Sequence, residues 1–153
     1  MTATDTGEPD GALRGLLEPG GGVTLVARRA SFPASDARGP ASHAERPSAL
    51  ELLLGALAAD LLGGLARECR RAGLGLRDAE LRLRARLENP LVALGVVGEE
   101  GSPAVRSIEG ALHASGVDTA PLEAAWATVM AHSPAYATLA RATSIRIEVR
   151  PLP

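Results

Sequence analysis

The sequence predicts an α+β fold, and three patterns predict it. A helix is predicted at residues 48–72, and its residues 52–65 are almost continuously apolar, as in a buried helix. Residues 79–88 and 144–150 alternate apolar and charged side chains, as half-buried strands do. The expected elements follow the order strand, long helix, strand, strand, helix, strand, which is typical of an α+β arrangement. At 153 residues the chain is long enough to bury a core as one domain.

The composition excludes several functional classes. All 16 basic residues are arginine, and they are interspersed with 18 acidic residues, so no basic stripe indicates a nucleic-acid partner. The single cysteine, Cys69, allows no intramolecular disulfide and favours a reducing, cytoplasmic compartment. No signal peptide is visible, and the apolar run at residues 50–62 is too short and interrupted to span a bilayer. Because His43, His113 and His132 are widely spaced, we expect no metal and no cofactor.

The N-terminal part of the chain is expected to contribute one strand. Residues 1–21 are rich in Thr, Asp, Gly and Pro and are expected to form a flexible tail, with a short helical turn at residues 13–17. The folded domain is then residues 22–153. Its first strand is expected at residues 23–29. The three prolines of residues 31–47 predict a long loop.

The long apolar segment has the start and stop signals of a helix. Ser48 and Glu51 have the spacing of a capping box at its start. Three arginines occupy the last turn, where positive charge is favourable, and Gly73 suits the left-handed position that ends a helix. The apolar surface of this helix exceeds what one half-exposed sheet can cover. We therefore expect a second copy of the chain to cover the rest, in a homodimer.

The C-terminal half is expected to alternate between strands and helices. Asn89 and Pro90 end the first strand, and a mixed connection follows to residue 103. Pro121 is favourable in the first turn of the next helix, and Pro134 breaks that helix after Ser133. The expected elements are strands at residues 79–88, 105–115 and 144–150, a helix at residues 119–132 and a shorter helix that ends at residue 139.

Asp60 is the residue that the apolar pattern does not explain. It lies in the middle of the long helix, between Ala59 and Leu61. A buried carboxylate without a partner is costly unless it binds a proton. Asp60 therefore has a polar partner, faces a cavity or solvent, or is protonated, and each of these outcomes points to a site.

Two stretches carry a family resemblance. Residues 46–60 read RPSALELLLGALAAD, and residues 133–136 read SPAY. They are similar to the G-P-S-P-x-E-L-L-L-A-A-L-A-x-C stretch and the later C-P-V or S-P-V marker of the OsmC/Ohr family, several members of which are thiol-dependent organic hydroperoxide reductases. The resemblance begins at about residue 22. It implies an antiparallel sheet wrapped on a long buried central helix plus a second helix, in an intertwined homodimer.

The two positions that carry the chemistry of the family differ in this chain. The resemblance implies a thiolate on the central helix that attacks the peroxide and a second cysteine that resolves the sulfenic acid as a disulfide. Asp60 and Ser133 stand at these positions, and neither side chain can pass through a sulfenic acid. We therefore predict that the chain is not a peroxidase. Instead, it is expected to bind a small, partly apolar ligand at the dimer-interface cleft, through Asp60, Ser133, His132 and Glu51.

Alternatives stay open for each of these residues. Asp60 either forms a hydrogen bond with Ser133 or lines a ligand pocket, where Arg28 or Arg29 is a candidate partner by resemblance to the active-site arginine of the family. Glu51 is either the carboxylate of the capping box or, as the resemblance implies, the partner of that arginine.

Three other functions also stay open. A thiol-dependent organic hydroperoxide reductase acting in oxidative stress defence would have to use Cys69, activated by the neighbouring arginines. Cys69 lies nine residues beyond Asp60, which places it on roughly the opposite face of the helix. A hydrolase with Asp60 as general base is conceivable, but no histidine is placed to complete a triad. A purely structural or interaction protein is the third.

Overall fold

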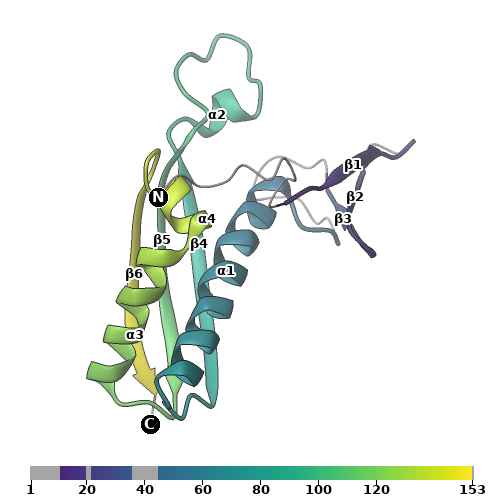
Figure 1. Cartoon of the computed structure of the whole chain (residues 1–153). Helices are drawn as coiled ribbons and strands as arrows, with labels where there is room; N and C mark the ends of the chain where they lie inside the picture. Colours follow the sequence, from purple (N-terminus) through teal and green to yellow (C-terminus); the bar gives the residue numbers. More distant parts are fainter. Residues whose placement is uncertain (1–10, 20–21, 36–44, 153) are drawn as a thin grey trace, which may run out of the picture. The chain divides into compact units, whose positions relative to one another are not determined.

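The computed structural model describes residues 11–19, 22–35 and 45–152. The chain divides into two compact units, residues 1–49 and residues 50–153. The first unit contains a three-stranded sheet, and the second contains another three-stranded sheet and the helices drawn in Figure 1.

The sheet of the first unit is antiparallel, with the order β1-β2-β3. Its strands are β1 (Arg14–Leu17), β2 (Val23–Ala27) and β3 (Ala30–Ala34). The expected strand at residues 23–29 is therefore present but ends at Ala27.

Two expectations for this unit are wrong. Residues Arg14–Leu17 form a strand paired with β2, and not a helical turn. The expected loop at residues 31–47 begins as strand β3, which contains Pro33. Proline lacks an N–H donor, but β3 is an edge strand, where proline is tolerated. The rest of that expected loop lies largely outside the described residues, and the domain boundary at residue 22 stays a prediction.

Helix α1 (Ala49–Arg71) matches the expected long helix and ends as predicted. Gly73 has a φ of 68°, the left-handed conformation that glycine adopts without a steric penalty. Its N–H donates to Arg70 O at 3.3 Å, and the N–H of Leu74 donates to Cys69 O at 2.8 Å. These two bonds form a Schellman motif, which satisfies carbonyls that the helix end leaves free. The capping box of Ser48 and Glu51 stays a prediction.

The sheet of the second unit has the order β4-β5-β6. Its strands are β4 (Asp78–Leu87), β5 (Val105–Ser115) and β6 (Ser144–Leu152), close to the three predicted ranges. β4 and β5 are antiparallel, but β5 and β6 are parallel, so the sheet is mixed and not purely antiparallel. A parallel pair needs a crossover connection, and helices α3 (Thr119–His132) and α4 (Pro134–Leu139) supply it.

The connection between β4 and β5 contains a short helix, α2 (Pro90–Ala93). Asn89 caps it, because its side-chain oxygen accepts hydrogen bonds from the backbone N–H groups of Leu91 and Val92. The segment projects beyond the end of the sheet (Figure 1).

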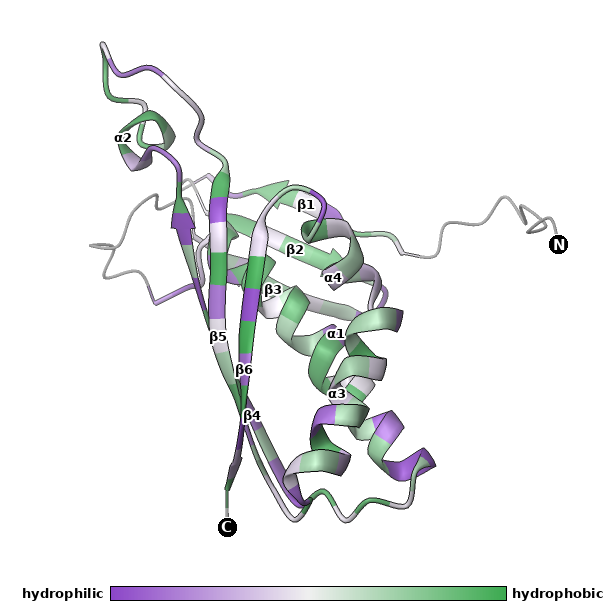
Figure 2. Cartoon of the chain, turned by 90° about the vertical axis from the view of Figure 1, so that its left-hand side faces the viewer, coloured by the Kyte–Doolittle hydropathy of each residue, from purple (hydrophilic) through white to green (hydrophobic). Residues whose placement is uncertain are grey.

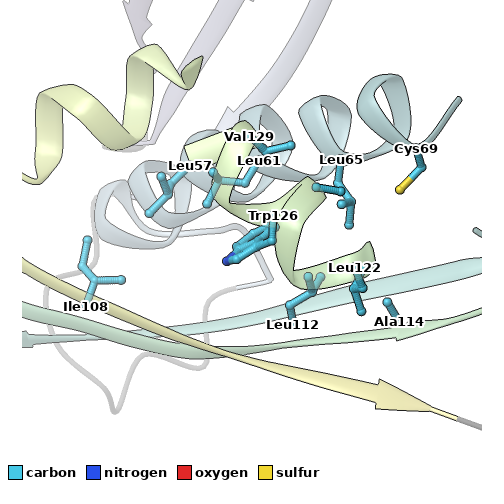
Figure 3. Close-up of a cluster of buried hydrophobic side chains, with 11 residues drawn as sticks. Leu57, Leu61, Leu65, Cys69, Ile108, Leu112, Ala114, Leu122, Trp126 and Val129 are labelled. Atoms are coloured by element: carbon cyan, nitrogen blue, oxygen red, sulfur yellow. The ribbon is translucent and has the colours of Figure 1, made fainter. Parts of the chain in front are cut away.

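The core of the second unit lies between the sheet and the two long helices, α1 and α3, on one face of the sheet (Figure 1). The other face of the sheet carries the charged residues. Figure 2 shows the resulting alternation of hydrophobic and hydrophilic residues along β5 and β6. The buried side chains that Figure 3 labels are Leu57, Leu61, Leu65, Cys69, Ile108, Leu112, Ala114, Leu122, Trp126 and Val129.

Helix α1 is only partly covered. Every fourth residue from Leu57 to Cys69 is buried, whereas Leu53 is 37% exposed and Ala56 and Ala59 are also exposed. Among the described residues, α1 is the one helix long and apolar enough to cross a membrane by length and composition. The run that we judged too short is thus part of a helix of 23 residues, and its buried stripe makes it a core helix of this fold.

Candidate functional site

Asp60 has polar partners at the start of α4. The hydroxyl of Ser133 donates a hydrogen bond to Asp60 Oδ2 at 2.6 Å, and the backbone N–H of Ala135 donates to the same oxygen at 3.1 Å. Ser133 is 4% exposed, and its Oγ in turn accepts from the backbone N–H of Tyr136 at 3.0 Å. The Asp60–Ser133 hydrogen bond, one of the two alternatives for Asp60, is therefore present.

The local sequence explains this arrangement. Ser133 is the C-cap of α3 and the N-cap of α4, and Pro134 occupies the first position of α4, where a missing N–H is harmless. The turn directs the hydroxyl and a backbone N–H toward Asp60 on α1. A carboxylate at the N-terminal end of a helix is also favourable, because the peptide dipoles leave that end partly positive.

Asp60 lies in a cleft of about 440 Å³ between α1 and α3. Residues four, seven, eight and eleven positions apart share one face of a helix, and the contributions of α1 follow this spacing from Asp60 onward. The cleft is lined by Asp60, Gly64, Arg67, Glu68 and Arg71 of α1, by Thr128, Val129 and His132 of α3, and by Ser133.

Gly64 sets how closely the two helices approach at this cleft. A Cβ atom added at Gly64 would lie 2.8 Å from Cγ1 of Val129, which is too close unless the Val129 side chain or one of the helices shifts. Glycine at this position therefore lets α3 pack directly against the backbone of α1.

One ion pair lies on the side of the cleft that α1 forms. Arg71 donates two hydrogen bonds to Glu68, at 2.9 and 2.6 Å. These bonds lower the pKa of Glu68, and the positive charges of Arg71 and His132 act in the same direction. Arg67, by contrast, forms no ion pair in the part of the chain that the structure describes.

His132 is exposed at the rim of the cleft. Its Nδ1 lies 2.8 Å from the carbonyl oxygen of Thr128. A carbonyl oxygen can only accept, so Nδ1 carries the proton in this contact. In the neutral imidazole, Nε2 is then the acceptor and the basic nitrogen.

Cys69 is not part of this cleft. It is 1% exposed and lies in the apolar core, where Figure 3 shows it beyond Leu65 on α1. Nine residues from Asp60, it is about half a turn away around the helix axis. Burial raises the pKa of the Cys69 thiol, and the negative charge of Glu68 raises it further. The expectation that the neighbouring arginines activate this thiol is therefore wrong, because those side chains extend from the polar faces of the helix.

Glu51 is not among the residues that line the cleft. Glu51 lies nine residues before Asp60, about 13 Å along the helix axis at 1.5 Å per residue. Arg28 and Arg29 are the exposed turn residues of the β2–β3 hairpin in the first unit, and Arg28 has a φ of 54°. Their expected role beside Asp60 stays a prediction.

The described residues contain no group of three or more His, Cys, Asp and Glu suited to a metal ion. His113 lies on the outer face of the sheet, in a second hollow of about 400 Å³. Arg82, Arg84 and Arg150 in that hollow are each paired with a glutamate, which is typical of a solvated sheet face. His43 lies outside the described residues.

Sequence reasoning missed most of the charged residues of the cleft. Arg67 and Arg71 were assigned to the helix end and to the surroundings of Cys69, and Glu68 and Thr128 were not considered. The signal was available, because Arg67, Glu68 and Arg71 follow Asp60 at helical spacing on one face.

Comparison with solved structures identifies the architecture. The structure matches an OsmC-like protein from Mycoplasma pneumoniae with a TM-score of 0.79 and 15% sequence identity, over 95% of this chain and 99% of that chain. The chain has the OsmC-like fold.

Two further solved structures with the OsmC-like fold agree. A putative osmotic stress induced and detoxification response protein from Psychrobacter arcticus gives a TM-score of 0.73 at 8% identity, over 94% of this chain and 98% of that one. The organic hydroperoxide resistance protein OhrB of Bacillus subtilis gives 0.67 at 11% identity, over 92% and 97%. No protein-family model matches the sequence, and no curated protein matches it either.

Proposed function

We propose that this chain is a divergent OsmC/Ohr family member that does not reduce peroxides and binds a small, partly apolar ligand in the cleft beside Asp60. The observation that carries the proposal is the 2.6 Å hydrogen bond between Ser133 Oγ and Asp60 Oδ2. It joins the two positions where, by resemblance, the family has its two reactive cysteines.

The chemistry of these two side chains opposes a peroxidase. Reduction of a peroxide by a thiolate transfers one oxygen to sulfur, and a second thiol then releases it as water with formation of a disulfide. A carboxylate and a hydroxyl cannot complete either step. The sole cysteine does not replace them, because Cys69 is buried and its pKa is raised. The alternative function, a thiol-dependent organic hydroperoxide reductase, is therefore disfavoured.

The cleft supports ligand binding. Its volume of about 440 Å³ suits a small molecule, and it combines hydrogen-bonding groups with the apolar side chain of Val129. The methylene stems of Arg67 and Arg71 add apolar surface. By resemblance, the protein is a homodimer and the cleft lies at its interface. The single cysteine favours a reducing, cytoplasmic compartment.

The first experiment measures reduction of cumene hydroperoxide with dithiothreitol as the reductant. We expect no turnover above the reaction of free dithiothreitol, for the wild type and for Cys69→Ser alike. Turnover in the wild type that disappears in Cys69→Ser would restore the peroxidase function. Turnover in both would contradict our assignment of Asp60 and Ser133.

The second experiment tests binding itself. Titration with a set of small amphiphilic fragments, followed by ¹H–¹⁵N NMR, is expected to shift the backbone amides of Gly64, Thr128 and Val129. Amides on the outer face of the sheet, such as Ala111, serve as the internal control. Fragments that leave all cleft amides unmoved would refute the ligand-binding function.

A further inference from the structure

Asp60 lines the cleft, and its two hydrogen bonds use only one of its two carboxylate oxygens. Both hydrogen bonds to Asp60 end on Oδ2, and both come from neutral donors. In the described part of the chain, Oδ1 accepts no hydrogen bond and no cation pairs with the carboxylate. The negative charge of Asp60 is therefore not compensated by a neighbouring side chain.

Arg67 presents an uncompensated positive charge to the same cleft. Whereas Arg71 is held by Glu68, Arg67 has no ion pair among the described residues. A Cβ added at Gly63 would lie 3.4 Å from Nη1 of Arg67, so the guanidinium folds back over the glycine. Long side chains on a helix point toward its N-terminus, which here is the direction of Asp60.

The cleft therefore contains equal numbers of acidic and basic side chains from α1, but only one acidic and one basic side chain pair with each other. Glu68 and Arg71 neutralise each other, whereas Asp60 and Arg67 line the same cleft and form no ion pair with each other in the described part of the chain. A ligand with one charge would compensate one of these residues and leave the other without a partner. A ligand that carries both charges, joined by a short apolar stretch, would compensate both.

We propose, on the basis of the ligand-binding function above, that the cleft binds a small zwitterion, with its ammonium group at Asp60 Oδ1 and its carboxylate on the Arg67 guanidinium. Guanidinium and carboxylate groups can form two parallel hydrogen bonds, which fixes the orientation of the bound molecule. The apolar stretch between the charged groups lies over Gly64 and Val129.

Four probes of equal chain length test this assignment: 6-aminohexanoate, hexanoate, hexylamine and 1-hexanol. Binding is measured from the shifts of the cleft amides in ¹H–¹⁵N NMR. We expect 6-aminohexanoate to bind about fivefold more tightly than hexanoate or hexylamine, since a partly exposed charge pair contributes modestly. Its affinity should fall as salt is added, whereas that of 1-hexanol should not.

Substitutions separate the two ends of the ligand. Arg67→Gln should reduce the affinity for 6-aminohexanoate to that for hexylamine, and Asp60→Asn should reduce it to that for hexanoate. Arg70→Gln is the matched control, because Arg70 is an exposed arginine on the same helix outside the cleft. Arg67 is also exposed, so its substitution tests the proposal even if Asp60→Asn perturbs folding.

Three results would overturn the zwitterion assignment. Equal affinity for 6-aminohexanoate and 1-hexanol, or equal losses in Arg67→Gln and Arg70→Gln, would leave the ligand-binding function standing with a different ligand class. No shift of cleft amides with any of the four probes would also overturn it, and the ligand-binding function would then be decided by the fragment titration.

Discussion

At residue 60, one carboxylate oxygen accepts hydrogen bonds from a hydroxyl and from a backbone N–H. These bonds explain how a charged side chain is tolerated in an apolar helix, because they replace part of the hydration that burial removes. The sequence identified Asp60 as unusual, since it is the one charged residue between Glu51 and Arg67. It could not choose between Ser133 and an arginine as the partner, because that choice depends on the tertiary packing of α4.

The double substitution Asp60→Cys with Ser133→Cys should form a disulfide under mild oxidation. The side chains of these residues already meet, with 2.6 Å between Ser133 Oγ and Asp60 Oδ2, and a disulfide needs Cα atoms about 4.4–6.8 Å apart. Loss of two hydrogen masses in the intact protein would report the bond. The single variant Asp60→Cys is the control, and a folded double variant that stays reduced would contradict the geometry.

Glu68 should make the protein more sensitive to acid. Its pKa is lowered below the ordinary value of 4.5 by the hydrogen bonds from Arg71, so the pair stabilises the fold above that pH and the stabilisation is lost as pH falls through the folded pKa. The melting temperatures of wild type and Glu68→Gln should therefore differ near pH 7 and converge on acidification. Glu123→Gln, on the exposed side of α3, is the control; a difference that persists at pH 2 would contradict this origin.

Among the elements, the long helices and the strands of the second unit were predictable from local patterns. The alternation of β4 and the periodicity of α1 repeat over enough residues to identify one structure. Strands β1 and β3 were missed because they are short, and Pro33 reads as a loop residue unless its strand is known to lie at an edge. The parallel pairing of β6 was also beyond the pattern, since alternation does not encode strand direction.

Adjacent glycines of α1 should respond oppositely to alanine. Gly63→Ala meets only the end of the Arg67 side chain and should stabilise the helix by about 0.5–1 kcal/mol through lower backbone entropy. Gly64→Ala places Cβ against Val129 and should destabilise the protein by about 1–3 kcal/mol, as overpacking does. Chemical denaturation measures both changes. A Gly64→Ala variant as stable as Gly63→Ala would show that α1 and α3 do not pack this closely.

For the whole molecule, the incomplete cover of α1 is the main structural argument for a homodimer. Leu53 is 37% exposed on a helix whose composition is that of a core element. Leu53, Ala56 and Ala59 are exposed at three-residue spacing on this helix, and contiguous exposed apolar surface is typical of an interface. The oligomeric state was an expectation from the sequence and stays a prediction, since a single chain is described.

Sedimentation velocity should therefore give a dimer at micromolar concentration. Leu53→Glu should shift the protein toward monomer, because a charge on this surface opposes its burial. Val97→Glu is the matched control, since Val97 is 99% exposed on the connection between β4 and β5, away from α1. A wild type that sediments as a monomer would remove the argument, and equal effects of the two substitutions would place the interface elsewhere.

The burial of Cys69 has a practical consequence for labelling the protein. Because the native sulfur lies within the core, a maleimide or a nitroxide reagent applied to the folded protein should find only a cysteine introduced at the surface. Spin labels or fluorophores can thus be attached one site at a time without first removing the native residue. The distances between pairs of such labels, one on each compact unit, would report how the two units are arranged.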